Sequence, residues 1–294
     1  MTREEFKKLV VEKILILDGG TGSFLLSKGM PQGVCPEVWV MDNPEPILQL
    51  QGAYCEAGSN VVMAPTFGAN RIRLKGSGRE NDIAQINTSN VKLSREAVKG
   101  KCLVAGNVSM TGLIIYPDDD ESFDEAVEVY KEQARILDDA GCDLFAVETM
   151  ISLEDARTAV RGIKAVSQRP VMVTMTFESN GRTLYGDTPE KVARVLTEEG
   201  VDALGTNCST GPKNMKDIIK AMAAVTDLPI IAKPNAGLPH QDEQGRITYD
   251  LQPEEFADEM MELIDAGARI VGGCCGTTPE HIRSLAAAVN SRKS

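Results

Sequence analysis

Residues 269–279 read Arg-Ile-Val-Gly-Gly-Cys-Cys-Gly-Thr-Thr-Pro, a short apolar run followed by two adjacent cysteines between glycines and then by a proline. Short runs rich in β-branched residues are typical of strands that are buried on both faces. Proline is common in the first turn of a helix. The stretch therefore predicts a strand, a glycine-rich turn and a helix, with two thiols at the end of the strand.

The same succession of strand and helix is repeated along the chain. Seven more apolar runs lie at 14–17, 60–64, 101–106, 143–147, 170–175, 203–205 and 229–232. Helices are predicted at 44–57, 123–140, 153–166, 189–199, 212–225, 253–266 and 279–289. Several of them begin near a proline or end in glycine, which are common start and stop signals. Eight repeats predict an α/β fold, a single (β/α)8 TIM barrel over residues 1–294, with a doubly wound open sheet as the alternative.

The composition excludes several classes of partner. The chain has 294 residues, a net charge of −12 and 42% hydrophobic residues, enough to bury a large core. The acidic balance argues against nucleic acid or an anionic membrane, since both require clusters of Lys and Arg. No apolar run approaches the roughly 20 residues of a membrane helix, and the N-terminal residues lack the apolar centre of a signal peptide. These features predict a cytoplasmic protein.

The seven cysteines fall into two groups. An odd number in a long chain without a signal peptide does not predict a disulfide framework. Four of them lie in ordinary surroundings and are predicted to be unmodified thiols: Cys35, Cys55, Cys102 and Cys142. The other three, Cys208, Cys274 and Cys275, lie among polar residues and glycines at predicted strand ends.

The barrel brings these three thiols together. Active sites of such barrels lie at the C-terminal ends of the strands. Cys208 and the pair Cys274 and Cys275 end two strands that flank the strand at 229–232, so their side chains can converge over it. Neighbouring residues of a regular strand point to opposite faces. The pair can therefore share a ligand only where the surrounding glycines let the backbone leave strand geometry.

Converging thiols in a chain with two histidines favour a soft metal. Zn²⁺ and Cu(I) prefer thiolates, and zinc with three thiolates keeps a fourth position open, which is a catalytic arrangement. An iron–sulfur cluster usually requires a fourth cysteine, and His240 and His281 are poorly placed to act as ligands. A vicinal disulfide and inert buried thiols are the alternatives to a metal.

The donor set also predicts a type of reaction. A zinc ion with three thiolates carries a net charge of about −1, so it is a weak Lewis acid toward water. It still lowers the pKa of a bound thiol, which is about 8.5 when free, and keeps the sulfur ionised at neutral pH. This chemistry predicts attack of a substrate thiolate on an electrophilic carbon, and therefore alkyl transfer to sulfur rather than hydrolysis.

Polar residues and two loops are predicted at the same end of the barrel. Asp18, Glu148 and Asn235 each follow a predicted strand. An unpaired buried carboxylate is costly, so Glu148 is predicted to be functional. The basic segment 68–82 and the segment 237–249 are predicted to be long loops that can act as lids.

These motifs carry a family resemblance. The chain resembles the homocysteine-binding domain of cobalamin-dependent methionine synthases and of stand-alone homocysteine S-methyltransferases. The landmarks are Asp18-Gly19-Gly20-Thr21-Gly22, Ala57-Gly58, Thr66-Phe67-Gly68-Ala69, Glu148-Thr149, Asn207-Cys208-Ser209, Pro234-Asn235-Ala236-Gly237 and residues 272–281. The resemblance covers nearly the whole chain, and the last landmark is the most specific.

The resemblance implies a catalytic zinc site. In it, Cys208, Cys274 and Cys275 bind the metal and the homocysteine sulfur takes the fourth position. Asn235 lies beside the metal and can fill that position through its side-chain oxygen when substrate is absent. The implied reaction is an in-line displacement in which the thiolate takes a methyl group and methionine leaves.

The resemblance also implies a pocket for the amino-acid end of the substrate. Glu148 holds the substrate ammonium and counts among the catalytic residues, and Asp18 helps to shape the pocket. Two segments depart from the family pattern near this end, Ala64-Pro65 and residues 107–111. They leave the acceptor open between homocysteine, selenohomocysteine and another small thiol.

The implied methyl donor is methylcobalamin or another methylcorrinoid on a partner protein or domain, because such barrels commonly form one module of methionine synthases. The chain has no corrinoid-binding motif Asp-x-His-x-x-Gly. The basic residues between 71 and 79 form either a docking loop for such a partner or a solvated loop. A small sulfonium such as S-methylmethionine is the alternative donor. A barrel with a purely structural zinc is the non-enzymatic alternative, although structural sites are closed by four protein ligands.

Overall fold

The computed structural model describes residues 1–115, 119–241 and 247–292. Its main sheet contains eight strands. They are β1 (Leu15–Ile16), β2 (Val61–Met63), β3 (Leu103–Val108), β4 (Leu144–Met150), β5 (Val171–Met175), β6 (Ala203–Asn207), β7 (Ile230–Lys233) and β10 (Ala268–Val271). Each strand overlaps one of the eight apolar runs from which strands are predicted.

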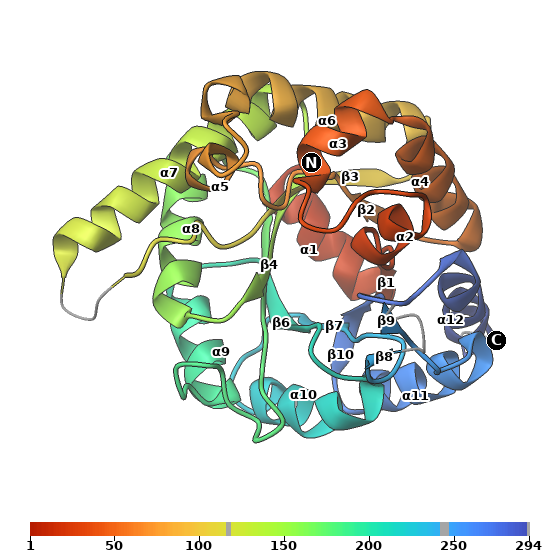
Figure 1. Cartoon of the computed structure of the whole chain (residues 1–294). Helices are drawn as coiled ribbons and strands as arrows, with labels where there is room; N and C mark the ends of the chain where they lie inside the picture. Colours follow the sequence, from red (N-terminus) through yellow and green to blue (C-terminus); the bar gives the residue numbers. More distant parts are fainter. Residues whose placement is uncertain (116–118, 242–246, 293–294) are drawn as a thin grey trace.

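The strands close into a barrel (Figure 1). All neighbours are parallel, in the order β1-β10-β7-β6-β5-β4-β3-β2. A further parallel bridge between Leu17 and Val61 joins the first strand to the second. The predicted TIM barrel is therefore confirmed. In this order β7 lies between β6 and β10, the two strands that precede the cysteines.

Helices surround the sheet. They are α1 (Arg3–Glu12), α2 (Gly22–Ser27), α3 (Pro36–Asp42), α4 (Glu45–Ala57), α5 (Arg71–Lys75), α6 (Ile83–Val98), α7 (Asp120–Asp139), α8 (Leu153–Lys164), α9 (Pro189–Glu198), α10 (Lys216–Ala223), α11 (Pro253–Asp265) and α12 (Pro279–Ser291). The seven predicted helices are present as α4 and α7 to α12. The apolar patterns do not predict the other five. In α6 the reason is clear, because its buried face carries Asn87, Asn90 and Ser94 and the apolar spacing is weak.

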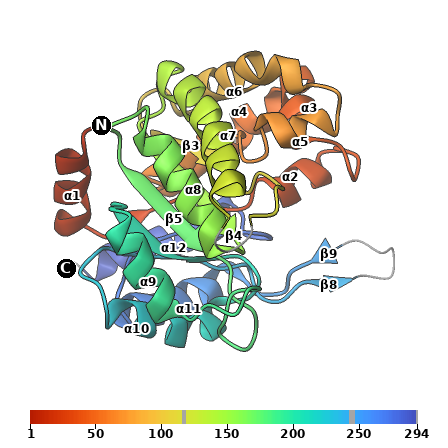
Figure 2. The same ribbon diagram turned by 90° about the vertical axis from the view of Figure 1, so that its left-hand side faces the viewer.

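The lower part of the barrel interior is apolar. Inward-facing residues such as Ala105, Ala146 and Ile231 form one buried cluster with Phe6 and Val10 of α1. Helix α1 therefore closes the N-terminal end of the barrel, opposite the end from which α2 and the β8–β9 hairpin extend (Figure 2).

The interior becomes polar one layer higher. Alternate residues of a strand face the same side, so the side chains two positions beyond the apolar layer also face inward. On β3, β4 and β7 these are Asn107, Glu148 and Lys233, which are 7%, 7% and 3% exposed. The candidate site thus begins where the apolar core ends.

Two of the cysteines differ from the prediction. Cys55 of α4 and Cys102, just before β3, form a disulfide with a Cα–Cα distance of 6.1 Å. The prediction of unmodified thiols is wrong for these two, because packing of the helix against the sheet brings together residues 47 positions apart in sequence. Cys35 and Cys142 are free, as predicted.

The segment 68–82 is more ordered than the predicted loop. It contains α5 and a short 3-10 helix, and two of its cations have partners. Arg71 pairs with Glu132, and Arg79 pairs with Asp82. Because these charges are compensated within the chain, the segment loses part of its support as a docking loop for an acidic partner.

The segment 237–249 contains an antiparallel hairpin of β8 (His240–Gln241) and β9 (Ile247–Thr248). The hairpin projects away from the barrel (Figure 2). Residues 242–246 of the predicted loop lie outside the described residues. Within the described ranges, no helix combines the length and apolarity needed to cross a membrane.

The contact between β6 and β7 leads to a stability prediction. A Cβ added at Gly205 would lie 2.0 Å from the carbonyl oxygen of Ile231, so the paired strands would have to separate. We expect Gly205→Ala to lower the free energy of unfolding by about 3 kcal/mol in denaturant titration. In the matched control Gly52→Ala, on helix α4, the Cβ would lie 3.8 Å from the carbonyl oxygen of Ala97, which is ordinary van der Waals contact. The control is expected to gain about 0.5–1 kcal/mol. Equal stability of the two variants would contradict this account of the strand contact.

Candidate active site

Three thiols meet at the C-terminal end of the barrel. The sulfur atoms of Cys208, Cys274 and Cys275 all lie within 4.8 Å of one another, and those of Cys208 and Cys275 are 4.0 Å apart. Tetrahedral coordination with Zn–S bonds of about 2.3 Å places two sulfurs about 3.8 Å apart. The cluster therefore has the dimensions needed to hold one such ion with little movement.

The backbone at Cys208 leaves strand geometry where β6 ends. Cys208 and Ser209 have φ of 62° and 60°, in the left-handed region that residues with a Cβ rarely adopt. Two hydrogen bonds hold this turn: Cys208 N donates to the carbonyl of Lys233 at 3.0 Å, and Thr210 N donates to the carbonyl of Cys208 at 2.7 Å. Strained backbone that is held in this way is typical of functional sites.

The second cysteine loop follows β10 and, like the first, is hydrogen-bonded to the end of β7. Cys274 N donates to the carbonyl of Pro234 at 2.7 Å, just beyond β7. Gly276 has φ of 79° and ends the turn. A Cβ there would lie 2.3 Å from the ring of Tyr249, so this position requires glycine for both conformation and space. The predicted departure from strand geometry is confirmed.

The environment keeps protons on the thiols when no cation is present. Hydrogen bonding with Cys274 lowers the pKa of Cys208, but Cys275 and burial together raise it to about 11. The bond to Cys208, together with burial, raises the pKa of Cys274 to about 12. Three neighbouring thiolates repel one another, so a metal ion has to displace these protons when it binds.

Asn235 lies directly beside the sulfurs. It is 3% exposed, and its Oδ1 accepts a hydrogen bond from Cys275 N at 3.1 Å. An amide oxygen has two lone pairs, so this bond leaves one acceptor direction free. Tyr249 approaches the same cysteine from the base of the hairpin. Hydrogen bonding with Cys208, and more weakly with Tyr249, lowers the pKa of Cys275, but Cys274 and burial raise it to about 12.

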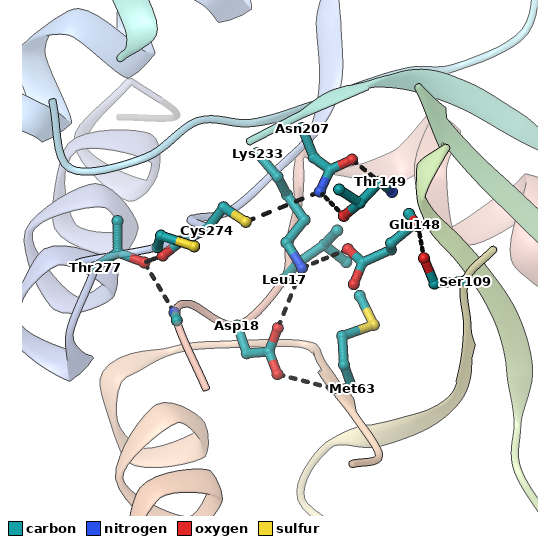
Figure 3. Close-up of polar contacts among 12 residues, drawn as sticks. Leu17, Asp18, Met63, Ser109, Glu148, Thr149, Asn207, Lys233, Cys274 and Thr277 are labelled. Atoms are coloured by element: carbon teal, nitrogen blue, oxygen red, sulfur yellow. Dashed lines mark hydrogen bonds and ion pairs between the residues drawn. The ribbon is translucent and has the colours of Figure 1, made fainter. Parts of the chain in front are cut away.

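A buried lysine lies between two carboxylates beneath the cluster (Figure 3). Lys233 Nζ is 2.6 Å from Glu148 Oε1 and 3.6 Å from Asp18 Oδ1. Burial alone would lower the pKa of Lys233, but the charges of Glu148 and Asp18 raise it well above its ordinary value. Burial raises the pKa of Asp18 to about 6, although the charge of Lys233 opposes this shift.

Asn207 connects the carboxylate region with the sulfurs (Figure 3). Its Oδ1 accepts from Thr149 N at 2.9 Å and its Nδ2 donates to Thr149 Oγ1 at 2.8 Å. The same Nδ2 lies 3.8 Å from Cys274 Sγ. Thr149 has φ of 62°, so this bidentate contact fixes an unusual turn directly after Glu148.

The structure thus brings together all six residues that the sequence predicts for the site: Asp18, Glu148, Cys208, Asn235, Cys274 and Cys275. Lys233 is a further site residue that the sequence patterns did not predict. A lysine two positions after Ile231 on a strand buried on both faces is an inward-facing charge, and this period-two spacing is the signal that could have found it.

The two histidines are engaged elsewhere. His281 Nε2 is 2.9 Å from the carbonyl oxygen of Leu251, and its Nδ1 accepts from Thr278 N at the start of α12. His240 is exposed on β8 beside Asp250.

Known proteins share this fold and sequence pattern. The family model of homocysteine S-methyltransferase matches residues 15–289. The metallated form of the homocysteine methyltransferase MmuM from Escherichia coli is 25% identical, with a TM-score of 0.79 over 94% of this chain and 96% of that chain. Its apo form gives 24% identity and a TM-score of 0.73 over the same shares. The carboxyl transferase domain of Rhizobium etli pyruvate carboxylase shares the fold alone, with 16% identity and a TM-score of 0.57 over 98% of this chain and 48% of that chain.

A barrel of this type with a three-thiol cluster at its C-terminal end, together with these matches, defines the protein as an S-methyltransferase. The family model covers most of the chain from the first strand to the last helix. The chain belongs to the homocysteine S-methyltransferase family.

The three-thiol cluster leads to a prediction about the metal affinity of a cysteine variant. Replacing Cys208 with serine removes one of three soft ligands, and we expect Cys208→Ser to lose metal affinity by more than the 10- to 100-fold typical of outer-shell changes. Metal content of the reduced, purified protein measures this, and circular dichroism is expected to show an intact fold. Cys35→Ser is the matched control, because Cys35 is a free thiol outside the cluster and its Sγ donates a hydrogen bond to Glu37 Oε2. Full metal content in Cys208→Ser would remove this cysteine from the metal site.

Proposed function

We propose that this protein is a zinc-dependent homocysteine S-methyltransferase that forms methionine. The observation that carries the proposal is the group of three thiols within 4.8 Å, which offers three protein ligands in the described part of the chain. Catalytic zinc sites have three protein ligands and one open position, whereas structural sites have four. Among the described His, Cys, Asp and Glu side chains no fourth one joins the group, which disfavours the alternative of a purely structural zinc.

The zinc, when bound, would keep the substrate sulfur ionised and nucleophilic at neutral pH. Cys208, Cys274 and Cys275 would hold it. Asn235 lies beside them and has an acceptor direction left for the metal or the incoming thiol. The proposed location is the cytoplasm, where the three cysteines would stay reduced, although the Cys55–Cys102 disulfide is of a kind that is rare there.

We propose that Glu148 and Asp18 hold the amino-acid end of homocysteine. Both are buried and negatively charged beside Lys233, at the layer where the barrel interior becomes polar. Asp18 Oδ1 is a buried oxygen that faces Lys233 Nζ at 3.6 Å, and the described residues supply no hydrogen bond to it, so a closer ammonium group can satisfy it. The barrel over residues 1–294 would then be one homocysteine-binding unit, with selenohomocysteine as a second possible acceptor.

The proposed donor is a methylcorrinoid such as methylcobalamin on a partner protein or domain. The surface around the site supports a large donor. Seven of the eight large apolar residues that are exposed in the described chain lie on segments that follow the C-terminal ends of strands: Leu26, Val34, Ile114, Leu184, Tyr185, Leu238 and Ile247. Exposed apolar side chains gathered on one face are typical of a protein interaction surface. S-methylmethionine remains the alternative donor.

A methyl-transfer assay tests the function and the donor together. Homocysteine is incubated with methylcobalamin, S-methylmethionine or S-adenosylmethionine, each with and without a chelator, and methionine is measured. We expect methylation that is lost with the chelator and restored by zinc, with methylcobalamin as the best of the three donors. A preference for S-methylmethionine would support the alternative donor. Methylation that is unaffected after complete removal of zinc would contradict the proposed mechanism.

The ammonium pocket gives a separate kinetic prediction. Glu148→Gln keeps the shape of the side chain but removes its charge, so we expect the KM for homocysteine to rise about 10- to 100-fold while metal content changes little. Steady-state kinetics and metal analysis measure the two effects. Glu128→Gln on α7 is the control, since the Glu128 side chain is 67% exposed and its carboxylate pairs with Lys131 at 2.6 Å on the surface. An unchanged KM in Glu148→Gln would refute the ammonium-binding role.

A further inference from the structure

Lys233 is a buried cation enclosed by opposite charges. Its side chain is 4% exposed, and its ammonium lies between the carboxylates of Glu148 and Asp18. Burial of an unpaired ammonium is strongly unfavourable, and so is burial of two unpaired carboxylates. The three groups therefore stabilise one another, and none of them would keep its charge and position alone.

The arrangement leaves binding capacity for a further cation. Lys233 contacts one oxygen of Glu148 at 2.6 Å. Asp18 Oδ2 accepts from Met63 N at 2.8 Å, while its Oδ1 faces Lys233 Nζ at 3.6 Å and has no hydrogen bond among the described residues. Two carboxylates and one ammonium leave one negative charge. One α-ammonium group of a substrate would neutralise it.

We propose that Lys233 is the positioning residue that makes this site selective for thiols with an α-amino group. The proposal rests on the proposed homocysteine-binding function. Lys233 fixes Glu148 and Asp18 side by side in their charged forms and so builds the place where the substrate ammonium binds. Two neighbouring carboxylates without this cation would repel each other, and one would take up a proton or turn away.

The backbone of the same residue fixes the distance to the sulfurs. The carbonyl of Lys233 accepts from Cys208 N at 3.0 Å, while its side chain reaches the carboxylates. The ammonium pocket and the cysteine loop are therefore attached to a single residue of β7. A thiol that fits both ends has to carry its amino group at a defined distance from its sulfur.

The test compares two thiols that differ in one group. Homocysteine and 4-mercaptobutyrate have the same chain and carboxylate, but the second lacks the ammonium. The ratio of their kcat/KM values, measured on zinc-loaded protein, reports selectivity and does not depend on the fraction of protein that is folded. We expect Lys233→Met to reduce this ratio by about 30-fold, the range expected for loss of a hydrogen bond to a charged group. The KM for homocysteine should rise more than kcat falls, and zinc content should stay close to that of the wild type.

A surface pair provides the matched control. Lys216 forms an ion pair with Glu262 at 2.8 Å, a distance similar to that between Lys233 and Glu148. Both side chains of this surface pair are exposed to solvent. Lys216→Met is expected to keep the wild-type ratio. An unchanged or higher ratio in Lys233→Met would overturn the proposal, since the lysine would then compete with the substrate ammonium or be purely structural.

A double variant keeps the test usable when Lys233→Met does not fold. Lys233→Met with Glu148→Gln removes both charges of the 2.6 Å pair and leaves fewer unpaired charges. Because Lys233 acts through both carboxylates and Asp18 remains, we expect the double variant to be at most as selective as Glu148→Gln. A double variant that is more selective than Glu148→Gln would show that Lys233 competes with the substrate ammonium, and would overturn the positioning role.

Binding measurements separate this inference from the proposed function. Calorimetry on the zinc-loaded wild type is expected to show tighter binding of homocysteine than of 4-mercaptobutyrate, and Lys233→Met is expected to lose that difference. A wild type that binds selectively but transfers no methyl group from any donor would contradict the proposed function alone. A wild type that transfers methyl groups while Lys233→Met keeps full selectivity would overturn this inference alone.

Discussion

The end of β7 holds the candidate site together. The carbonyl of Lys233 accepts from Cys208 N, and the carbonyl of Pro234 accepts from Cys274 N, so both cysteine loops are anchored to one short segment. Its neighbours β6 and β10 supply those loops from either side. A closed parallel barrel provides this arrangement because the C-terminal ends of adjacent strands meet at the same rim. Backbone contacts therefore hold the three sulfurs close together.

The apolar layer below the site gives these polar contacts their strength. The cluster that contains Ala105, Ala146 and Ile231 excludes water from the lower half of the barrel. Charges placed directly above an apolar layer interact more strongly than charges in water, and unpaired charges there are more costly. The pair of Lys233 with Glu148 is therefore a structural requirement of the site as well as a source of charge. A surface pair of similar length, such as Lys216 with Glu262, typically contributes about 0–1 kcal/mol.

The sequence predicts the features that follow from periodicity and from residue chemistry. Eight apolar runs are sufficient for the barrel, and glycines beside Cys274 and Cys275 are sufficient for the turn that lets both face one point. Lys233 escapes prediction because it ends an apolar run, where a lysine is usually read as the first solvated residue after a strand. Its role depends on Asp18 and Glu148, which lie 215 and 85 residues away in sequence and meet it only in the closed barrel.

Other features that the sequence did not predict also depend on contacts between residues that are distant along the chain. Helix α6 packs through asparagine side chains whose partners are backbone carbonyls elsewhere: Asn87 donates to Ala69 and Asn90 donates to Pro65. The bond between Cys55 and Cys102 also depends on a contact between distant elements. Patterns along the chain record which face of an element is apolar. They do not record which polar partner a buried side chain meets, so the sequence predicts the framework better than the hydrogen bonds that complete it.

Attachment of both halves of the site to β7 has a consequence for recognition under the proposed function. A strand paired on both sides within a barrel has little freedom to bend, so the separation between the sulfurs and the carboxylates is nearly fixed. The chain departs from the family pattern at Ala64-Pro65, just after β2, and at residues 107–111, at the end of β3 and beyond it; both segments lie outside β7 and leave this separation unchanged. Thr66 Oγ1 donates to the carbonyl of Asn107 at 2.8 Å and ties these two departures together. Variation in these two segments can therefore alter how the rest of the amino acid is bound. The distance required between its sulfur and its ammonium group is still determined by β7.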